Sequence, residues 1–256
     1  LLCSKIQFMG DKIMSNQDVK DVYGYSTLES ISGADRFNRW MYETIKPFCH
    51  GRILEIGGGI GNISQCFLND GEELVISELQ NEYCQILKDK FSGYTNLKDV
   101  IDLDIVDPDF DIKYDSLFGK FDTVFALNVV EHIADDRKAL ANCRKLLKKN
   151  GNIIILVPAF QTLFNHFDVA LGHFRRYTAK TLLSVFKANK YSVIHQQYFN
   201  CIGIAGWWVS GTLLRKKVIP EGQMKFYNFF VPVFRVIDRV THRWFGLSVV
   251  MVGRAE

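Results

Sequence analysis

The sequence lacks several features that would assign it to a specialised class. Its six cysteines form no CxxC pair and no Cys/His cluster at zinc-ligand spacing, so we expect reduced core thiols and no metal site. No apolar run reaches the roughly 18 uninterrupted residues that predict a membrane-spanning helix. Residues 1–17 lack the long apolar segment of a signal peptide, and together these absences favour a cytoplasmic protein.

The composition also excludes extremes of charge and order. The formal net charge of +3 is too small to indicate a nucleic-acid partner. Apolar residues make up 48% of the 256 residues and charged residues 23%, which is enough to fill a large core and argues against disorder. The length suits one α/β domain with an elaboration, or two small domains.

Short apolar strands alternate with helical patterns along the chain, which indicates a parallel sheet with crossover helices. The predicted strands are residues 52–56, 73–77, 99–103, 122–127, 152–157, 191–198 and 247–252. Apolar periodicity predicts helices within residues 28–48, 61–68, 81–91, 136–149 and 179–188.

A glycine-rich turn follows the first predicted strand. Residues 53–62 read ILEIGGGIGN, and four glycines stand within residues 57–61. Such a turn can adopt positive φ and lets a ligand approach the backbone closely, although a tight turn alone would also explain it. Glu55 precedes the glycines, and Glu78 ends the next strand, where a carboxylate can accept hydrogen bonds from ribose hydroxyls. The combination favours a nucleoside site.

The turn does not fit the dinucleotide fingerprint GxGxxG. Counting from Gly57 the last position is Asn62, and counting from Gly59 it is Ser64. A nicotinamide oxidoreductase is therefore disfavoured, and the GK[ST] of a P-loop is absent as well. The spacing is instead E-x-G-x-G-x-G.

This spacing, with SELQ, LDIVDP, FDTVFALNVVEHIADD and LLKKNGNIIILVPA, resembles the class I S-adenosylmethionine-dependent methyltransferases over about residues 52–159. The segment DVALGHFRRYTAKTL further resembles a bacterial subgroup associated with glycosyltransferases. The resemblance implies a Rossmann-like α/β fold with a seven-stranded, mostly parallel sheet in the order 3-2-1-4-5-7-6, flanked by helices. An aromatic-rich helical insertion would lie between strands six and seven.

The resemblance implies S-adenosyl-L-methionine as the cofactor, with S-adenosyl-L-homocysteine as the product. The cofactor-binding residues that it implies are Glu55, Gly57, Gly59, Gly61, Glu78, Leu79, Asp104 and Asn128. Glu78 would bind the ribose hydroxyls, and Glu55 would hold the ammonium end. Asp104 would accept a hydrogen bond from adenine, although Asp102 and Asp107 compete for this role and a helix cap is the structural alternative.

Methyl transfer requires a base only if the acceptor must lose a proton, as a hydroxyl does. The candidate catalytic bases are His132 and His173, and His132 is equally well explained as a scaffold residue. The predicted substrate-binding residues are Arg175, Arg176 and Tyr177. The two arginines would clamp a phosphate or carboxylate on the acceptor. Alternatively, one arginine pairs with Asp168 and closes the loop.

Residues 200–245 interrupt the alternation of strands and helices and are rich in aromatic side chains. They form either a helix pair that walls the acceptor pocket, or a surface that contacts a membrane or a lipid-linked acceptor, because basic residues stand beside Trp and Phe.

We therefore expect an N-terminal extension over residues 1–27 and one methyltransferase domain over residues 28–256, which includes the insertion as a lid. The acceptor would be a small molecule, a glycan or a lipid-linked molecule, with peripheral membrane contact through residues 207–245. NVVE stands where base-modifying enzymes carry a D/NPPY tetrad, so no nucleic acid is expected. The alternative function is a non-catalytic nucleoside-binding partner subunit.

Overall fold

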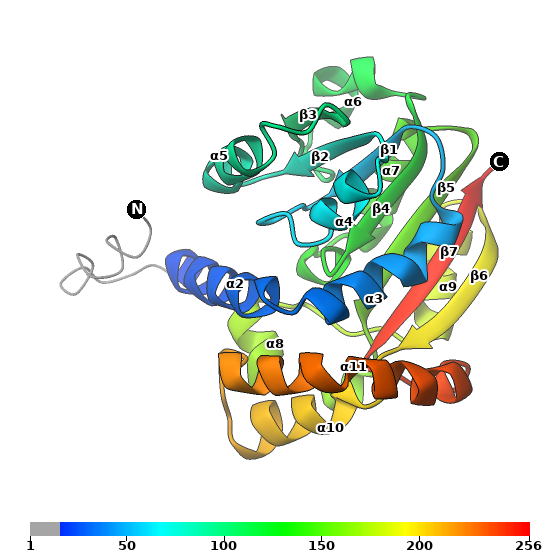
Figure 1. Cartoon of the computed structure of the whole chain (residues 1–256). Coiled ribbons are helices and arrows are strands. Elements are labelled where there is room, and N and C mark those ends of the chain that lie inside the picture. Colours follow the sequence, from blue (N-terminus) through cyan, green and yellow to red (C-terminus); the bar gives the residue numbers. More distant parts are fainter. Residues whose placement is uncertain (1–15) are drawn as a thin grey trace.

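The computed structural model describes residues 16–256, in which seven strands form one sheet with helices on both faces (Figure 1). The strands are β1 (Ile53–Ile56), β2 (Leu74–Glu78), β3 (Leu97–Asp102), β4 (Phe121–Leu127), β5 (Leu147–Pro158), β6 (Tyr191–Phe199) and β7 (Ser248–Ala255). Their order is β3-β2-β1-β4-β5-β7-β6, which confirms the order implied by the resemblance. Strands β1 to β5 pair in parallel, and β7 runs antiparallel to both of its neighbours.

Helices and short helical turns connect the strands. The α-helices are α2 (Asn16–Ser32), α3 (Asp35–Ile45), α4 (Ser64–Asn69), α5 (Asn81–Lys90), α6 (Phe110–Lys113), α7 (Asp136–Leu146), α8 (His166–Leu171), α9 (Ala179–Ala188), α10 (Gly203–Trp207) and α11 (Glu221–Thr241). The 3-10 turns are η1 (Lys46–Phe48), η2 (Asp115–Leu117), η3 (Val130–His132) and η4 (Gln161–Leu163), and η5 (Trp208–Leu213) is a π-helix.

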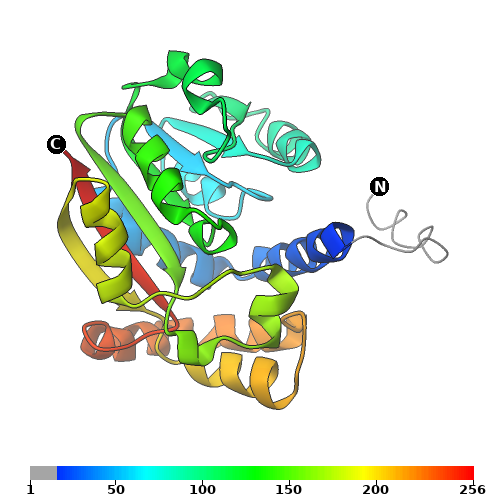
Figure 2. The ribbon, with the colours of Figure 1, turned by 180° about the vertical axis from the view of Figure 1, so that it is seen from behind.

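The apolar side chains of the sheet supply two separate core layers, because successive residues of a strand point to opposite faces. In β5, Ile153 and Ile155 pack with α7 and α9, whereas Ile154 and Leu156 pack with α3, α4 and α5. Figure 1 shows the face covered by α3, α4 and α5, and Figure 2 shows α7 and α9 on the opposite face. The central strands are therefore buried on both sides, which explains their continuous apolar runs.

The prediction of a helix over residues 136–149 is wrong at its carboxyl end. Helix α7 begins at its cap, where the Asp135 carboxylate accepts a hydrogen bond from the Lys138 N–H at 2.9 Å, but it ends at Leu146. Leu147 pairs with Phe121 of β4 and begins β5 instead. Asn150 then adopts a left-handed backbone (φ 65°), so the chain reaches the regular ladder after a register shift.

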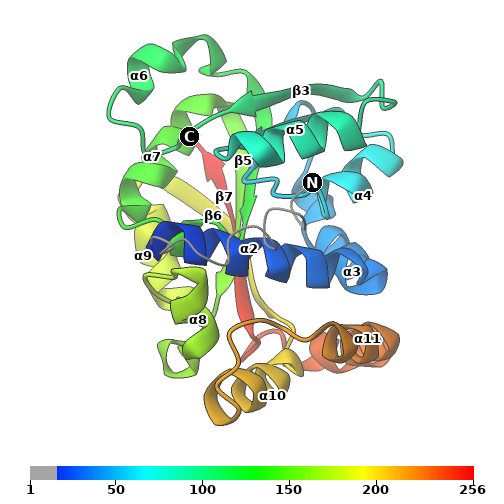
Figure 3. The ribbon, with the colours of Figure 1, turned by 90° about the vertical axis from the view of Figure 1, so that its left-hand side faces the viewer.

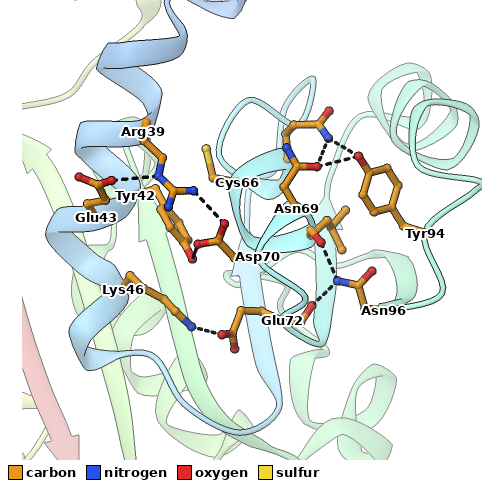
Figure 4. Close-up of polar contacts among 12 residues, drawn as sticks. Arg39, Tyr42, Glu43, Lys46, Cys66, Asn69, Asp70, Glu72, Tyr94 and Asn96 are labelled. Atoms are coloured by element: carbon orange, nitrogen blue, oxygen red, sulfur yellow. Dashed lines mark hydrogen bonds and ion pairs between the residues drawn. The ribbon is translucent and has the colours of Figure 1, made fainter.

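Polar contacts fasten α3 to the turn between α4 and β2 (Figure 4). The Asp70 carboxylate accepts hydrogen bonds from the Arg39 guanidinium at 2.9 Å and the Tyr42 hydroxyl at 2.7 Å. Lys46 forms an ion pair with Glu72 next to this pair. Each such partly exposed ion pair contributes up to about 1 kcal/mol, so together they orient α3 more than they stabilise the core.

Four helices, α2, α8, α10 and α11, gather beyond the carboxyl ends of the parallel strands and surround one region, whereas α6 lies at the opposite end of the molecule (Figure 3). Residues 200–245 contain α10, η5 and α11, as the resemblance implied. Helix α2 extends across the predicted boundary between the N-terminal extension and the domain, and that division stays a prediction. Among residues 16–256, no helix is long and apolar enough to cross a membrane.

Candidate functional site

A cavity of about 1150 Å³ opens at the carboxyl ends of the parallel strands. Turns after β1 to β4 form its base, and residues of α2, α10 and α11 line its walls. The order of the strands reverses between β1 and β4, where connections diverge to opposite faces and leave a crevice for a ligand. Ten of the predicted site residues line this cavity: Glu55, Gly57, Gly59, Glu78, Leu79, Asp104, Asn128, His132, His173 and Arg176.

The turn of residues 57–61 requires glycine for reasons of backbone and packing. Gly57 adopts a left-handed conformation (φ 72°), and a Cβ there would lie 2.6 Å from Cγ2 of Val129. The N–H groups of Gly57 and Gly58 donate to the Ser77 carbonyl at 2.9 and 3.0 Å. These bonds hold the bare main chain of the turn against the end of β2, beside the cavity.

Glu78 connects this turn to the end of β2. One carboxylate oxygen accepts a hydrogen bond from the Gly59 N–H at 2.7 Å. The other accepts from the N–H groups of Leu79 at 2.8 Å and Gln80 at 3.3 Å. Each carboxylate oxygen has two lone pairs, so the oxygen that faces Gly59 can accept a further hydrogen bond from a ligand.

Glu55 lies on β1 beneath the turn and is 4% exposed. Its carboxyl group accepts a hydrogen bond from the Ser64 hydroxyl. Burial raises the pKa of Glu55 to about 7, the Ser64 hydroxyl opposes this shift, and the negative charge of Glu78 adds to it. A cationic ligand group in the cavity would stabilise the charged form of this carboxyl.

Two further predicted residues end their strands at the cavity. Asp104 follows β3, and its carboxylate accepts a hydrogen bond from the Val106 N–H at 2.8 Å. Asp102 and Asp107, its competitors for the adenine role, do not line the cavity, and Asp107 pairs with Lys113. Asn128 follows β4 in a left-handed conformation (φ 55°) and lines the cavity.

Three predicted residues do not line the cavity. A Cβ on Gly61 would lie 2.5 Å from the Phe91 ring, so this glycine allows close packing in the core. Arg175 donates to two backbone carbonyls of residues 133–134 and pairs with Asp136, and the Tyr177 hydroxyl donates to the same carboxylate at 2.9 Å. Arg175 and Tyr177 therefore fasten the segment after α8 to the start of α7.

A second polar group lies on the other side of the cavity, after β4. Glu131 of η3 is fully buried, and its two carboxyl oxygens have no hydrogen-bond partner in any other residue that the structure describes. Burial raises the pKa of this carboxyl to about 8. The ring centres of His132 and His173 lie 4.6 Å apart in an edge-to-face arrangement. One ligand atom each from Glu131, His132 and His173 lies within 4.8 Å of the other two.

Asp168 of α8 organises this part of the site. Its carboxylate accepts hydrogen bonds from the Asn165 N–H at 2.9 Å, which caps α8, from Nδ1 of His173 at 2.7 Å and from Nε of Arg176 at 2.8 Å. Burial opposes ionisation of Asp168, but these donors hold its pKa below the usual value. Because a carboxylate only accepts, Nδ1 of His173 carries the proton and its Nε2 lone pair is available.

Arg176, rather than Arg175, makes the predicted pair with Asp168 and also lines the cavity. Its Nη1 donates to the Ala159 carbonyl at 3.1 Å, and its guanidinium lies 4.7 Å from the centre of the Trp207 ring. Nη2 of Arg176 and Nε1 of Trp207 are buried and have no hydrogen-bond partner within residues 16–256. Trp207 was not among the predicted site residues, because no local pattern distinguishes it from the other aromatic residues of the insertion.

Residues 54–153 match the model of a family described as a methyltransferase domain. The chain is 31% identical to a highly reducing polyketide synthase of Aspergillus sclerotiorum over 115 residues. This matched segment covers 41% of this chain and 4% of the synthase. The chain is also 22% identical to a ubiquinone biosynthesis O-methyltransferase of Erwinia tasmaniensis over 114 residues. This second matched segment covers 44% of this chain and 45% of that enzyme. The chain thus spans less than half the length of either relative.

Among solved structures, a SAM-dependent methyltransferase from Archaeoglobus fulgidus shares the fold with a TM-score of 0.55 and 16% identity, covering 85% of this chain and 94% of that chain. The family match contains the turn after β1, Glu78 and η3. His173 and Arg176 lie outside it. The family match therefore covers the turn after β1, the end of β2 and η3, but not the segment after α8 that contributes His173 and Arg176 to the cavity.

Proposed function

We propose that this chain, which carries a methyltransferase domain of the class I fold, transfers the methyl group of S-adenosyl-L-methionine to a small-molecule, glycan or lipid-linked acceptor. The observation that carries the proposal is the position of Glu78 at the carboxyl end of β2, next to the strand-order reversal and hydrogen-bonded to the bare turn of residues 57–61. When bound, the cofactor supplies a methyl group already activated by a sulfonium, and transfer is an in-line displacement.

The residues on this side of the cavity suit the cofactor, and we call them the cofactor end. The carboxylate of Glu78 binds the ribose hydroxyls through its remaining lone pairs. Glu55 stabilises the ammonium group, and Asn128 presents its backbone to the amino-acid portion. Leu79, which is 58% exposed, packs on adenine, and Asp104 accepts a hydrogen bond from the adenine amino group.

The opposite side, around Glu131, His132 and His173, forms the acceptor end. An imidazole there removes a proton from an acceptor hydroxyl, since histidine titrates near neutral pH. Nη2 of Arg176 binds an anionic group of the acceptor, because this buried donor has no protein partner among the described residues. Arg175 keeps the loop in place.

The proposal is tested by incubating the chain with radiolabelled S-adenosyl-L-methionine and a panel of hydroxyl-bearing glycans and lipid-linked sugars. We expect the label to be transferred to one class of acceptor. In a separate binding assay, we expect the chain to bind S-adenosyl-L-homocysteine but not NAD. Binding without transfer to any acceptor would support the alternative, a non-catalytic partner subunit. No binding at all would overturn both functions.

The outer face of α11 supports a lipid-linked acceptor. Apolar side chains at helical spacing on α11, with Trp244 just beyond its end, form a stripe in which each is more than half exposed: Phe226, Phe229, Val233, Val236, Val240 and Trp244. Met224, Val231 and Asp238 are buried on the opposite face. Exposed basic residues flank the stripe at Lys225, Arg239 and Arg243. An apolar face with basic flanks suits the interface of an anionic membrane, so we propose peripheral membrane contact of an otherwise cytoplasmic protein.

Co-sedimentation with anionic phospholipid vesicles tests this contact. We expect the chain to sediment with the vesicles, and Phe229→Glu to leave it in the supernatant. Ile112→Glu is the matched control, because Ile112 is an exposed apolar residue of α6, away from the stripe. Equal sedimentation of both variants, or wild-type protein that stays in the supernatant, would contradict membrane contact.

A further inference from the structure

Three side chains at the acceptor end have the chemistry of metal ligands. Glu131 and His132 stand side by side in η3, and the backbone of the segment after α8 brings His173 to them, because the Phe174 N–H donates to the Glu131 carbonyl at 2.8 Å. One ligand atom from each residue lies within 4.8 Å of the other two. Two imidazoles and one carboxylate are a common donor set for zinc and other divalent transition metals.

The state of Glu131 is a second, independent observation. Its side chain is fully buried on the cavity wall, and neither carboxyl oxygen has a hydrogen-bond partner among the other described residues. The nearby cation of Arg176 makes its ion pair with Asp168. A buried carboxyl group without a partner is unfavourable, and a bound cation would satisfy it.

His173 is held in an orientation and tautomer that suit a ligand. The Asp168 carboxylate accepts the Nδ1 proton at 2.7 Å, so Nε2 carries the free lone pair. A carboxylate that fixes the distal nitrogen of a metal-binding histidine is a recurring feature of such sites, because it fixes the ring and raises its basicity. Asp168 is itself fixed by Arg176 and by the cap of α8.

We propose that Glu131, His132 and His173 bind one divalent transition-metal ion of the zinc type at the acceptor end, with a fourth position open to the cavity. Nitrogen and oxygen ligands lie about 2.0–2.2 Å from zinc, which places tetrahedral ligand atoms roughly 3.4 Å apart. The three ligand atoms, which lie within 4.8 Å of one another, therefore need to draw closer by at most roughly 1.4 Å.

The metal ion gives the acceptor end a defined role, which rests on the proposed methyl transfer. With the ion bound, both imidazoles serve as ligands instead of bases, and an acceptor hydroxyl that occupies the open position becomes more acidic and loses its proton to water near neutral pH. Its oxygen then forms the bond to the methyl carbon as the carbon–sulfur bond breaks, with the electron pair passing to sulfur. The site thus selects acceptors with a hydroxyl group.

Metal binding is tested directly on the full chain after chelator treatment, by equilibrium dialysis against Zn²⁺ and elemental analysis. We expect one ion per chain, and at least tenfold weaker binding in Glu131→Gln and His132→Ala. X-ray absorption of the zinc-loaded chain should show imidazole and oxygen ligands. His50→Ala, an exposed histidine outside the cavity, is the matched control and should bind like the wild type.

Absence of stoichiometric zinc, or binding that survives both substitutions, would overturn the proposal. His132 is exposed, so His132→Ala remains informative even if Glu131→Gln fails to fold. Binding of S-adenosyl-L-homocysteine is measured on the same samples. If that ligand binds and zinc does not, the metal site fails while the proposed function stands; if zinc binds and that ligand does not, the proposed function fails.

Discussion

At the cofactor end of the cavity the carboxylate of Glu78 accepts three backbone hydrogen bonds, whereas at the acceptor end the carboxyl group of Glu131 accepts none from the other described residues. The first end is built from turns that directly follow neighbouring strands. The second combines η3, the segment around α8 and the ring of Trp207 from α10.

This difference suggests a division of labour. At the cofactor end, backbone N–H groups of the neighbouring turns hold the Glu78 carboxylate in place. The acceptor end keeps buried donors and an acid that have no partners among the described residues, which is unfavourable unless a ligand satisfies them. The groups without partners therefore indicate where a variable substrate or an ion belongs.

The largest expected effect concerns the arginines of the acceptor end. Arg176→Ala leaves the fully buried Asp168 without its cationic partner, and we expect a loss of about 3–5 kcal/mol in the free energy of unfolding. Arg175→Ala removes a partly exposed pair and should cost roughly 1 kcal/mol. Urea denaturation measures both. Equal losses would show that the two arginines do not differ as the geometry indicates.

The next effect is the pH dependence caused by Glu55. Its pKa rises from 4.5 in the unfolded chain to about 7 in the fold, so the folded state holds the proton more tightly. Raising the pH through this window therefore destabilises the fold by about 3 kcal/mol in total, most of it between about pH 5 and pH 8. Glu55→Gln removes this dependence.

We therefore expect the stability of Glu55→Gln relative to wild type to increase with pH across that window. Urea denaturation at several pH values measures the difference, and subtraction cancels the other titrating groups. A difference that stays constant with pH would contradict the burial argument for this carboxyl.

A smaller loss of stability, compared between Gly57→Ala and Gly71→Ala, separates the cost of backbone strain from the cost of a packing clash. Gly57 and Gly71 both adopt positive φ (72° and 79°), but only at Gly57 would a Cβ meet a neighbour, Cγ2 of Val129. Gly71→Ala should cost about 1 kcal/mol from backbone strain alone, and Gly57→Ala should cost roughly 1–3 kcal/mol more. Thermal unfolding of the two variants compares them, and equal losses would remove the packing argument.

The sequence was sufficient to predict that the residues of the cofactor end lie close together, because that end is local; their roles in binding stay predictions. Glu78 and the glycine turn follow neighbouring strands, so an apolar run and its last residue suffice to bring them together. The sheet order came from the resemblance and is confirmed, but the end of α7 was missed because Leu147 is decided by its pairing with Phe121.

The proximity of the acceptor-end residues could not be predicted from local sequence in the same way. His132 and His173 were predicted separately, yet their contact depends on the cap of α8 and the hub at Asp168, which periodicity does not reveal. No metal site was expected, because α7, β5, η4 and α8 lie between His132 and His173 in the sequence. The role of each acceptor-end residue stays a prediction.

Binding of S-adenosyl-L-homocysteine to Glu78→Ala, measured by calorimetry, tests the central claim most directly. Hydrogen bonds to a charged group contribute about 1.5–3 kcal/mol, so we expect affinity to fall by roughly 10- to 150-fold. Glu82→Ala, an exposed acid on α5, should bind like the wild type. Unchanged affinity in Glu78→Ala would contradict the claim that this carboxylate binds the sugar of the cofactor.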